Sequence, residues 1–204
     1  MNAAPDSRPD PAPDGGSAPG APEPSAPLLN IANALTVLRL VLVPVFIWLM
    51  LRDGDPARLA AAIVFIVAAV TDRLDGQLAR SRNLITSFGK IADPIADKAL
   101  TGAGFITLSM IGEIPWWITV VIIARELGIT LMRFWVIRHG VMPASRGGKV
   151  KTFLQALAIG LFVIPLSSLP VEWLWRGLAW AILLAALVVT IATAVDYVMK
   201  AMTL

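Results

Sequence analysis

Four aspartates between residues 72 and 97 have the spacing of a carboxylate site. Asp72 and Asp75 are three residues apart and Asp93 and Asp97 are four apart, so each pair would lie on one face of a helix. A short connection between two such helices would bring both pairs together. The sequence therefore predicts two neighbouring helices that present four carboxylates to each other.

Carboxylates gathered in this way need cations, because like charges at close range oppose one another's ionisation. Mg²⁺ and Mn²⁺ prefer oxygen ligands, and two such ions can stabilise the attacking and leaving oxygens of a phosphoryl transfer. The chain has no cysteine and one histidine, which excludes thiolate and multi-histidine metal sites. The alternative is that the aspartates simply pair with nearby cations: Arg73, Arg80 and Lys98.

A second set of charged residues is mostly basic and lies in or beside apolar runs. Its basic members are Arg39, Arg125, Arg133, Lys149 and Lys151. Arg125 and Glu126 fall near the middle of an apolar run, where an ionisable residue by default marks a functional site. The set predicts a cavity for the phosphate group of a small polar acceptor. For Lys149 and Lys151, the alternative is that the side chains merely reach from a helix end to the membrane interface.

The elements that must position these residues are membrane spans. Of the 204 residues, 57% are hydrophobic and only 15% charged, and the mean hydropathy is +0.74. A span needs roughly 20 apolar residues, and such runs lie at 34–51, 57–76, 95–112, 115–138, 152–169 and 173–197. We expect an all-α integral membrane protein with six transmembrane helices. Pro44 and Pro165 would lie inside spans and kink them.

The placement of Lys and Arg predicts the orientation of these spans. The second and fourth connections are rich in Lys and Arg, whereas the other three are short and acidic or balanced in charge. Basic connections face the cytoplasm. Both termini and the aspartates are therefore expected on the cytoplasmic side.

Residues 1–27 have a different composition from the rest of the chain. They hold eight of the fifteen prolines and no aromatic residue, Leu, Ile or Val. We expect a disordered tail, because such a segment cannot bury enough apolar surface to fold. Residues 28–204 would form one membrane domain, with 16 Lys and Arg against 10 Asp and Glu. This basic balance favours anionic lipid or phosphate as partners and not nucleic acid.

The aspartate segment resembles the signature of the CDP-alcohol phosphotransferase family. It reads D-x2-D-G-x2-A-R-x8-G-x3-D-x3-D, with no departure at any fixed position. Membership implies six transmembrane helices, usually a homodimer, and metal-dependent transfer of a phosphoalcohol group from a CDP-linked donor with release of CMP. The resemblance assigns two Mg²⁺ or Mn²⁺ ions to Asp72, Asp75, Asp93 and Asp97. It also makes Asp97 the candidate general base.

The same resemblance assigns a binding site for CDP-diacylglycerol, the lipid donor. Its residues are Asn33, Thr36, Gly76, Ala79, Arg80 and Thr86. Three further segments, 30–39, 124–133 and 148–155, are similar to the bacterial branch that uses glycerol 3-phosphate as acceptor, with Ala32 in place of that branch's proline. The implied reaction gives phosphatidylglycerophosphate and CMP at the bacterial cytoplasmic membrane.

Two other functions stay open at this point. Within the family, a phosphatidylinositol-phosphate or cardiolipin synthase would differ only in its acceptor. A divalent-cation transporter would also carry intramembrane carboxylates. A transporter needs acids that connect both sides of the membrane, however, whereas the four aspartates cluster toward one side.

Overall fold

The computed structural model describes residues 31–81, 86–136, 146–165 and 170–202. Within these ranges the chain forms six α-helices and no strand, which confirms the all-α prediction. The helices are α1 (Ile31–Met50), α2 (Asp55–Ser81), α3 (Ser87–Met110), α4 (Trp116–Val136), α5 (Arg146–Val163) and α6 (Glu172–Met202). The expected tail, residues 1–27, lies outside the described residues.

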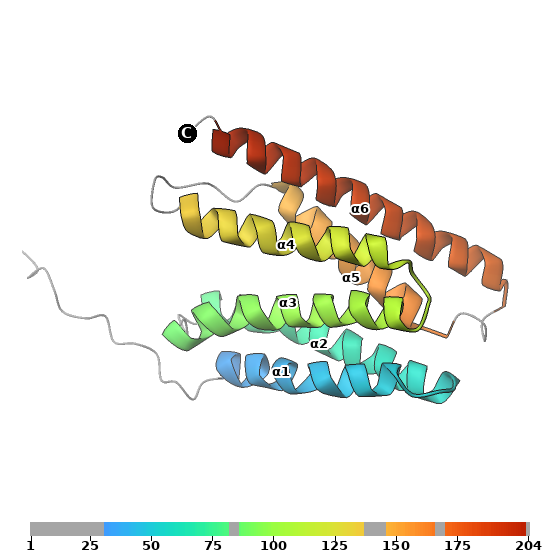
Figure 1. Cartoon of the computed structure of the whole chain (residues 1–204). Coiled ribbons are helices and arrows are strands. Elements are labelled where there is room, and N and C mark those ends of the chain that lie inside the picture. The colour runs from blue at the N-terminus through green and yellow to red at the C-terminus, as the bar shows by residue number, and fades with distance from the viewer. Residues whose placement is uncertain (1–30, 82–85, 137–145, 166–169, 203–204) are drawn as a thin grey trace, which may run out of the picture.

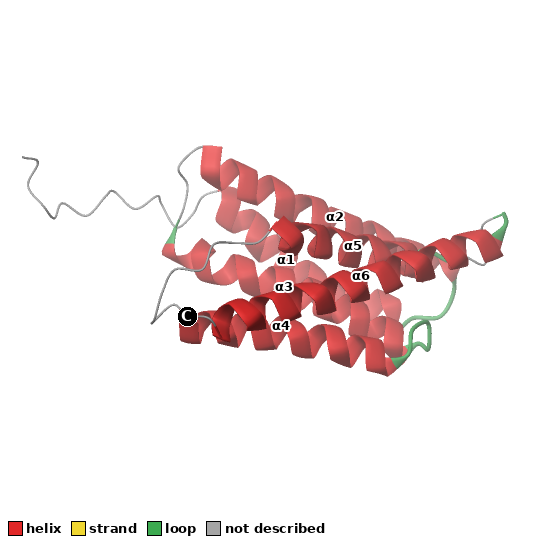
Figure 2. Cartoon of the chain, turned by 90° about the horizontal axis from the view of Figure 1, so that it is seen from above, coloured by secondary structure: helices red, strands yellow, loops and turns green. Residues whose placement is uncertain are grey.

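The helices form one bundle and alternate in direction along it (Figure 1). The N-termini of α1, α3 and α5 and the C-termini of α2, α4 and α6 gather at one end, called here the aspartate end. Helix α1 packs against α2 and α3, α4 packs against α3 and α6, and α5 contacts α2, α3 and α6. The view from above (Figure 2) shows the same alternation of connections between the two ends of the bundle.

The predicted pair of aspartate helices is present. Helix α2 ends at Ser81 and α3 begins at Ser87, so the two are joined by a short connection. At the aspartate end both helices extend beyond the apolar runs that predicted them, because a helix that has formed one turn can be extended at either end at little further cost. Asp72 and Asp75 therefore lie on the last turns of α2, and Asp93 and Asp97 lie on the first half of α3.

One predicted proline position is wrong. Pro44 lies inside α1, as expected, but α5 ends at Val163 and Pro165 follows it. Proline disfavours the helical conformation of the preceding residue and cannot donate a backbone hydrogen bond. Pro165 therefore follows the end of α5 and does not kink it.

Gly112 ends α3 in a left-handed conformation. Its φ is +79°, and its N–H donates to the carbonyl of Ser109 at 3.2 Å while the N–H of Glu113 donates to that of Leu108 at 2.9 Å. This pair of hydrogen bonds is a Schellman motif, which satisfies carbonyls left over at a helix C-terminus. The turn places Glu113 at the end of the bundle remote from the aspartates.

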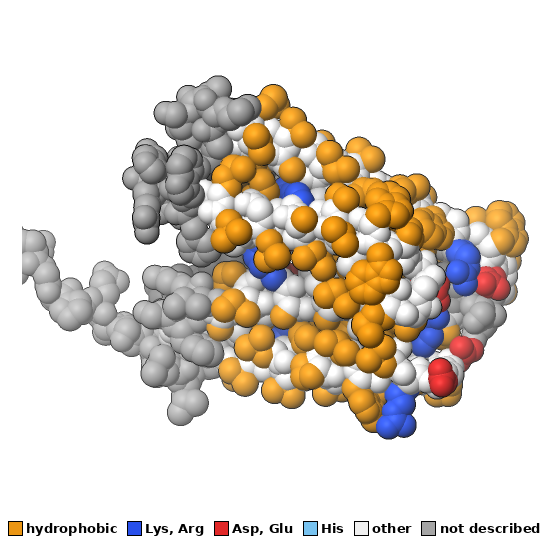
Figure 3. All heavy atoms as spheres, in the orientation of Figure 1, with side chains coloured by type: hydrophobic (Ala, Val, Ile, Leu, Met, Phe, Trp, Pro, Cys, Tyr) orange, Lys and Arg blue, Asp and Glu red, His pale blue; other side chains and the backbone are white. Residues whose placement is uncertain are grey.

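Glu113 joins several helices at that remote end. It pairs with Arg58 of α2 at 2.6 Å and with Arg176 of α6 at 3.3 Å. Arg58 also donates to the carbonyl of Phe162 in α5, and Arg176 pairs with Glu172. In Figure 3 charged side chains gather at this end, whereas hydrophobic side chains cover the flank of the bundle.

Within the described ranges, two helices have the length and composition to cross a membrane. These stretches are Asn33–Met50 in α1 and Glu172–Met199 in α6, with mean hydropathies of 2.0 and 2.5. Only 28% of each stretch is buried, whereas a core helix of a soluble protein would be mostly covered by protein. Large hydrophobic side chains such as Trp48, Ile63 and Val188 are exposed on several helices. This outward apolar surface is typical of a protein that contacts lipid.

Gly104 allows α3 to approach α5 closely. A Cβ at this position would lie 2.7 Å from Cγ2 of the buried Ile159, and that β-branched side chain has little rotational freedom. We expect Gly104→Ala to destabilise the bundle by about 1–3 kcal/mol, measured as a lower unfolding temperature in detergent. Gly102→Ala is the matched control, because no atom lies within 4 Å of a Cβ there. Equal unfolding temperatures for the two variants would contradict this packing.

Candidate active site

Polar side chains of α1 hold the aspartate helices in place. The hydroxyl of Thr36 donates to Oδ1 of Asp93 at 2.6 Å. Nη1 of Arg39 lies 2.7 Å from Oδ1 of Asp72, and the Arg39 side chain is completely buried. Both contacts use only one carboxylate oxygen. Helix α1 thus contacts one aspartate from α2 and one from α3, and it fixes their orientation.

Asn33 and Thr86, both predicted to bind the lipid donor, contact each other. The hydroxyl of Thr86 donates to Oδ1 of Asn33 at 2.9 Å, and both side chains are buried. This contact joins the start of α1 to the residue just before α3. It adds a second link between α1 and the segment that carries Asp93 and Asp97.

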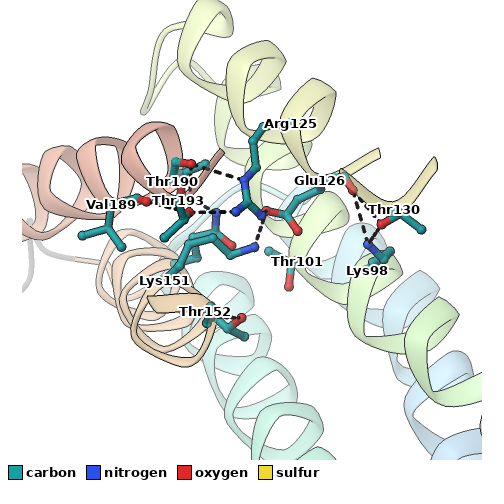
Figure 4. Close-up of polar contacts among 12 residues, drawn as sticks. Lys98, Thr101, Arg125, Glu126, Thr130, Lys151, Thr152, Val189, Thr190 and Thr193 are labelled. Atoms are coloured by element: carbon teal, nitrogen blue, oxygen red, sulfur yellow. Dashed lines mark hydrogen bonds and ion pairs between the residues drawn. The ribbon is translucent and has the colours of Figure 1, made fainter. Parts of the chain in front are cut away.

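Glu126 contacts two members of the predicted basic set, the name used here for Arg39, Arg125, Arg133, Lys149 and Lys151. Its Oε1 accepts a hydrogen bond from Nζ of Lys151 and another from Nη1 of Arg125, the latter at 3.2 Å. Figure 4 shows the three side chains meeting between α4 and α5. Lys151 is buried, so its charge is neutralised inside the bundle and not at the surface. This position contradicts the alternative that Lys151 only reaches toward the interface.

Arg125 connects α4 to α6. Its Nε donates to the carbonyl of Thr190 at 3.2 Å, and its Nη2 donates to the hydroxyl of Thr193 at 2.7 Å. Gln155 of α5 also donates to the Thr190 hydroxyl at 3.1 Å. The guanidinium is therefore held in a fixed orientation by α6 and by Glu126, as the prediction of an inward-facing residue requires.

Lys98 is a site residue that the sequence reasoning treated only as an ion-pair partner for the aspartates. Its ammonium group donates to the hydroxyl of Thr130 and contacts the carbonyl of Glu126 at 3.5 Å, both in α4. Its place directly after Asp97, on the helix that carries the second aspartate pair, was the available signal. Lys98 therefore lies between the aspartates and the basic set.

One cavity of about 1080 Å³ joins the aspartates to the basic set. Its size is typical of a site for a ligand larger than a small metabolite. The charged residues that line it are Arg39, Asp72, Asp97, Lys98, Arg125, Glu126, Lys149 and Lys151. Its apolar wall comes mainly from α2 and α5 and includes Phe65, Val70, Phe153 and Leu157. Figure 3 shows Lys or Arg atoms recessed between the helices of the bundle.

The structure places the other predicted site residues with less detail. Lys149 is exposed at the rim of the cavity. Gly76, Ala79 and Arg80 lie on the last turns of α2, and Arg133 lies on the last turn of α4. Their side chains, like that of Asp75, are outside the described part of the chain.

Three of the four predicted metal ligands have described side chains, namely Asp72, Asp93 and Asp97. Among the described side chains, no three carboxylate or histidine groups converge on one point, and Asp75 is not among those side chains. The donor set fits a hard divalent cation, because Asp72, Asp93 and Asp97 offer only oxygen. Hydrogen-bonded partners that orient the carboxylates are also typical of metal sites, and Thr36 and Arg39 occupy those positions.

Comparison with known proteins gives a consistent result. A family model described as CDP-alcohol phosphatidyltransferase matches residues 29–192. A protein of Mycobacterium tuberculosis named "Probable phosphatidylglycerophosphate synthase" is 51% identical over 180 residues, which cover 87% of this chain and 84% of that protein. A Bacillus subtilis protein named "CDP-diacylglycerol--glycerol-3-phosphate 3-phosphatidyltransferase" is 37% identical over 85% of this chain and 95% of its own length. A Rickettsia typhi protein of the same name is 40% identical over 66% of this chain.

Proposed function

Because the chain belongs to the CDP-alcohol phosphatidyltransferase family, we propose that it transfers a phosphatidyl group from CDP-diacylglycerol to glycerol 3-phosphate. The products are phosphatidylglycerophosphate and CMP. The observation that carries this proposal is that Asp72 and Asp97 line the same cavity as Lys149 and Lys151. Carboxylates suit a metal-bound diphosphate, and cations suit the phosphate of the acceptor. The names of the relatives support the same reaction.

The proposal includes a place in the bacterial cytoplasmic membrane. All six helices cross it, and both termini and the aspartate end face the cytoplasm. The alternating helix directions and the exposed apolar flank support this arrangement. The aspartate end would then open to soluble glycerol 3-phosphate, while the lipid donor enters from the side. We also expect a homodimer, which the family resemblance implies.

The donor would bind across the aspartates and the apolar wall. Gly76, Ala79 and Arg80 on α2 would contact its diphosphate or cytidine, and Asn33, Thr36 and Thr86 would shape the same region. The apolar residues that α2 and α5 contribute to the cavity would contact the acyl chains. Two Mg²⁺ or Mn²⁺ ions held by Asp72, Asp75, Asp93 and Asp97 would neutralise the diphosphate charge.

The acceptor would bind between Asp97 and the basic set. Lys151 has three N–H donors, of which one is given to Glu126. The others would bind the acceptor phosphate, together with Arg125, Arg133 and Lys149. Arg39, also predicted in this set, borders the cavity from the Asp72 side.

Asp97 lines the cavity and is the candidate general base. It would take the proton from the primary hydroxyl of glycerol 3-phosphate. The hydroxyl oxygen then attacks the β-phosphorus of the donor, and the bond to the CMP oxygen breaks. Arg80 and the cations at the aspartates would stabilise the charge that develops on the phosphoryl oxygens.

Lys151→Ala tests the acceptor site. We expect an apparent KM for glycerol 3-phosphate about ten- to a hundredfold higher, because one charge-assisted contact contributes roughly 1.5–3 kcal/mol. Arg133→Ala should act in the same direction. The KM for CDP-diacylglycerol should change little in either variant, as measured by CMP release at varied concentrations of each substrate. If these variants raise the KM for CDP-diacylglycerol and leave the KM for glycerol 3-phosphate unchanged, the basic residues bind the CDP group and not the acceptor.

The function itself is tested with the purified protein. CDP-diacylglycerol is offered with glycerol 3-phosphate, inositol phosphate or phosphatidylglycerol, and the lipid product is identified by mass. Phosphatidylglycerophosphate should form only with the first acceptor. Product from inositol phosphate or phosphatidylglycerol alone would place the chain elsewhere in the family, and the absence of product with all three would contradict the proposed reaction.

A further inference from the structure

The two carboxylate oxygens of Glu126 have different surroundings. Oε1 accepts the hydrogen bonds from Lys151 and Arg125. Oε2 accepts none from any group in the described part of the chain, and the side chain is 22% exposed and lines the cavity. Among the described side chains, the buried nitrogen and oxygen atoms that have no hydrogen-bond partner belong to Arg39 and Arg58 and not to Glu126, so Oε2 is open to the cavity and can accept a hydrogen bond from a ligand there. Oε2 is therefore an open acceptor that faces the place proposed for substrate.

The groups around Oε2 indicate which substrate group could donate a hydrogen bond to it. Glu126 is a carboxylate that contacts the basic set, so its charge repels the acceptor phosphate from Oε2 and leaves that phosphate to the cations. Asp97, which lines the same cavity as Glu126, is already assigned to the primary hydroxyl as its general base. Glycerol 3-phosphate has one other donor, its central hydroxyl, on the carbon between the reacting hydroxyl and the phosphate-bearing carbon.

We propose that Oε2 of Glu126 accepts a hydrogen bond from this central hydroxyl and thereby selects acceptors that carry it. The inference rests on the proposed function, since it assumes that glycerol 3-phosphate is the acceptor. Glu126 thus has two tasks at one carboxylate. Oε1 orients Lys151 and Arg125, and Oε2 recognises the substrate. A site that hydrogen-bonds a substrate hydroxyl discriminates strongly against the analogue that lacks it.

The competing view is that Glu126 only positions the two cations. The two views differ in one measurable quantity, the ratio of kcat/KM for glycerol 3-phosphate to kcat/KM for 3-hydroxypropyl phosphate. The second compound lacks only the central hydroxyl. Loss of a positioning contact lowers both values together, whereas loss of a recognition contact lowers only the first. The ratio does not depend on how much of a preparation is active, so a partly folded variant still gives a valid answer.

The experiment compares the full chain in detergent with Glu126→Gln and Glu126→Ala. In the Gln variant, Lys151 and Arg125 require the amide oxygen, so the amide nitrogen takes the place of Oε2 and presents donors instead of an acceptor. We expect the wild-type protein to prefer glycerol 3-phosphate by about tenfold to a hundredfold, and both variants to lose most of that preference. Glu113→Gln, the same change at the remote end of the bundle, should keep the wild-type ratio.

The outcomes separate this inference from the proposed function. A wild-type protein that uses both compounds equally, or variants that keep the wild-type ratio, would overturn the role of Oε2 and leave the reaction intact. If the wild-type protein uses neither compound but accepts inositol phosphate, the proposed function itself fails. Variants in which the use of 3-hydroxypropyl phosphate falls as much as that of glycerol 3-phosphate show that Glu126 is a positioning residue only.

Discussion

Removal of divalent cations with EDTA is expected to abolish CMP release, and added Mg²⁺ or Mn²⁺ is expected to restore it. Four carboxylates on α2 and α3 offer only oxygen, the ligand that these cations prefer. Without the cations, the diphosphate of the donor would meet a cluster of like charge. Ca²⁺ should restore activity poorly, because it is larger and takes more ligands at longer distances.

The measurement is CMP release in detergent with both substrates saturating. EDTA already loaded with an equal amount of Mg²⁺ is the control, since it tests whether the chelator itself harms the protein. A second reading is independent of turnover: Mn²⁺ should bind to the wild-type protein and bind less well to Asp93→Asn. Full activity in excess chelator would show that the aspartates act through basic partners such as Arg39.

Local spacing made part of this site predictable. The i, i+3 and i, i+4 intervals placed the aspartates on two helices, and the structure has α2 and α3 joined by a short connection. The depth of Arg125 and Glu126 in an apolar run likewise predicted that both face inward, and both are largely buried. These inferences needed only helix periodicity and the cost of a charge away from water.

Contacts between distant helices could not be predicted in the same way. Arg39 pairs with Asp72, although its charge alone placed it with the acceptor cations. Lys151 pairs with Glu126, 25 residues earlier in the chain. The spacing of residues along one helix does not predict that these two side chains meet. Such pairs depend on how α1, α4 and α5 pack, which one helix's sequence does not encode.

Helix ends were also only partly predictable. The apolar runs marked where lipid would contact the chain, but α2 and α3 continue into polar sequence at the aspartate end. Hydropathy measures composition, whereas a helix continues as long as its backbone hydrogen bonds are made. Six membrane spans stay a prediction, because among the described helices only α1 and α6 have both the length and the hydropathy of a membrane span.

Asp97→Asn is expected to lower kcat by about 10²–10⁴-fold, the usual contribution of a general base. The side chain keeps its shape but can no longer accept the proton of the acceptor hydroxyl. Asp97 lines the main cavity and is partly buried, so the change falls where the reaction is proposed to occur. The KM values for both substrates should change by less than tenfold, because the donor and the acceptor phosphate keep their other contacts.

Asp53→Asn is the matched control, since Asp53 is exposed in the connection between α1 and α2 and its substitution should leave kcat unchanged. Raising the concentration of Mg²⁺ separates the two roles that the resemblance gives Asp97. A variant restored by high Mg²⁺ has lost mainly a metal ligand, whereas a variant that stays slow at every concentration has lost the base. If Asp97→Asn turns over at the wild-type rate, the proton must leave through another group. Glu126, which lines the same cavity, is then the residue to replace next.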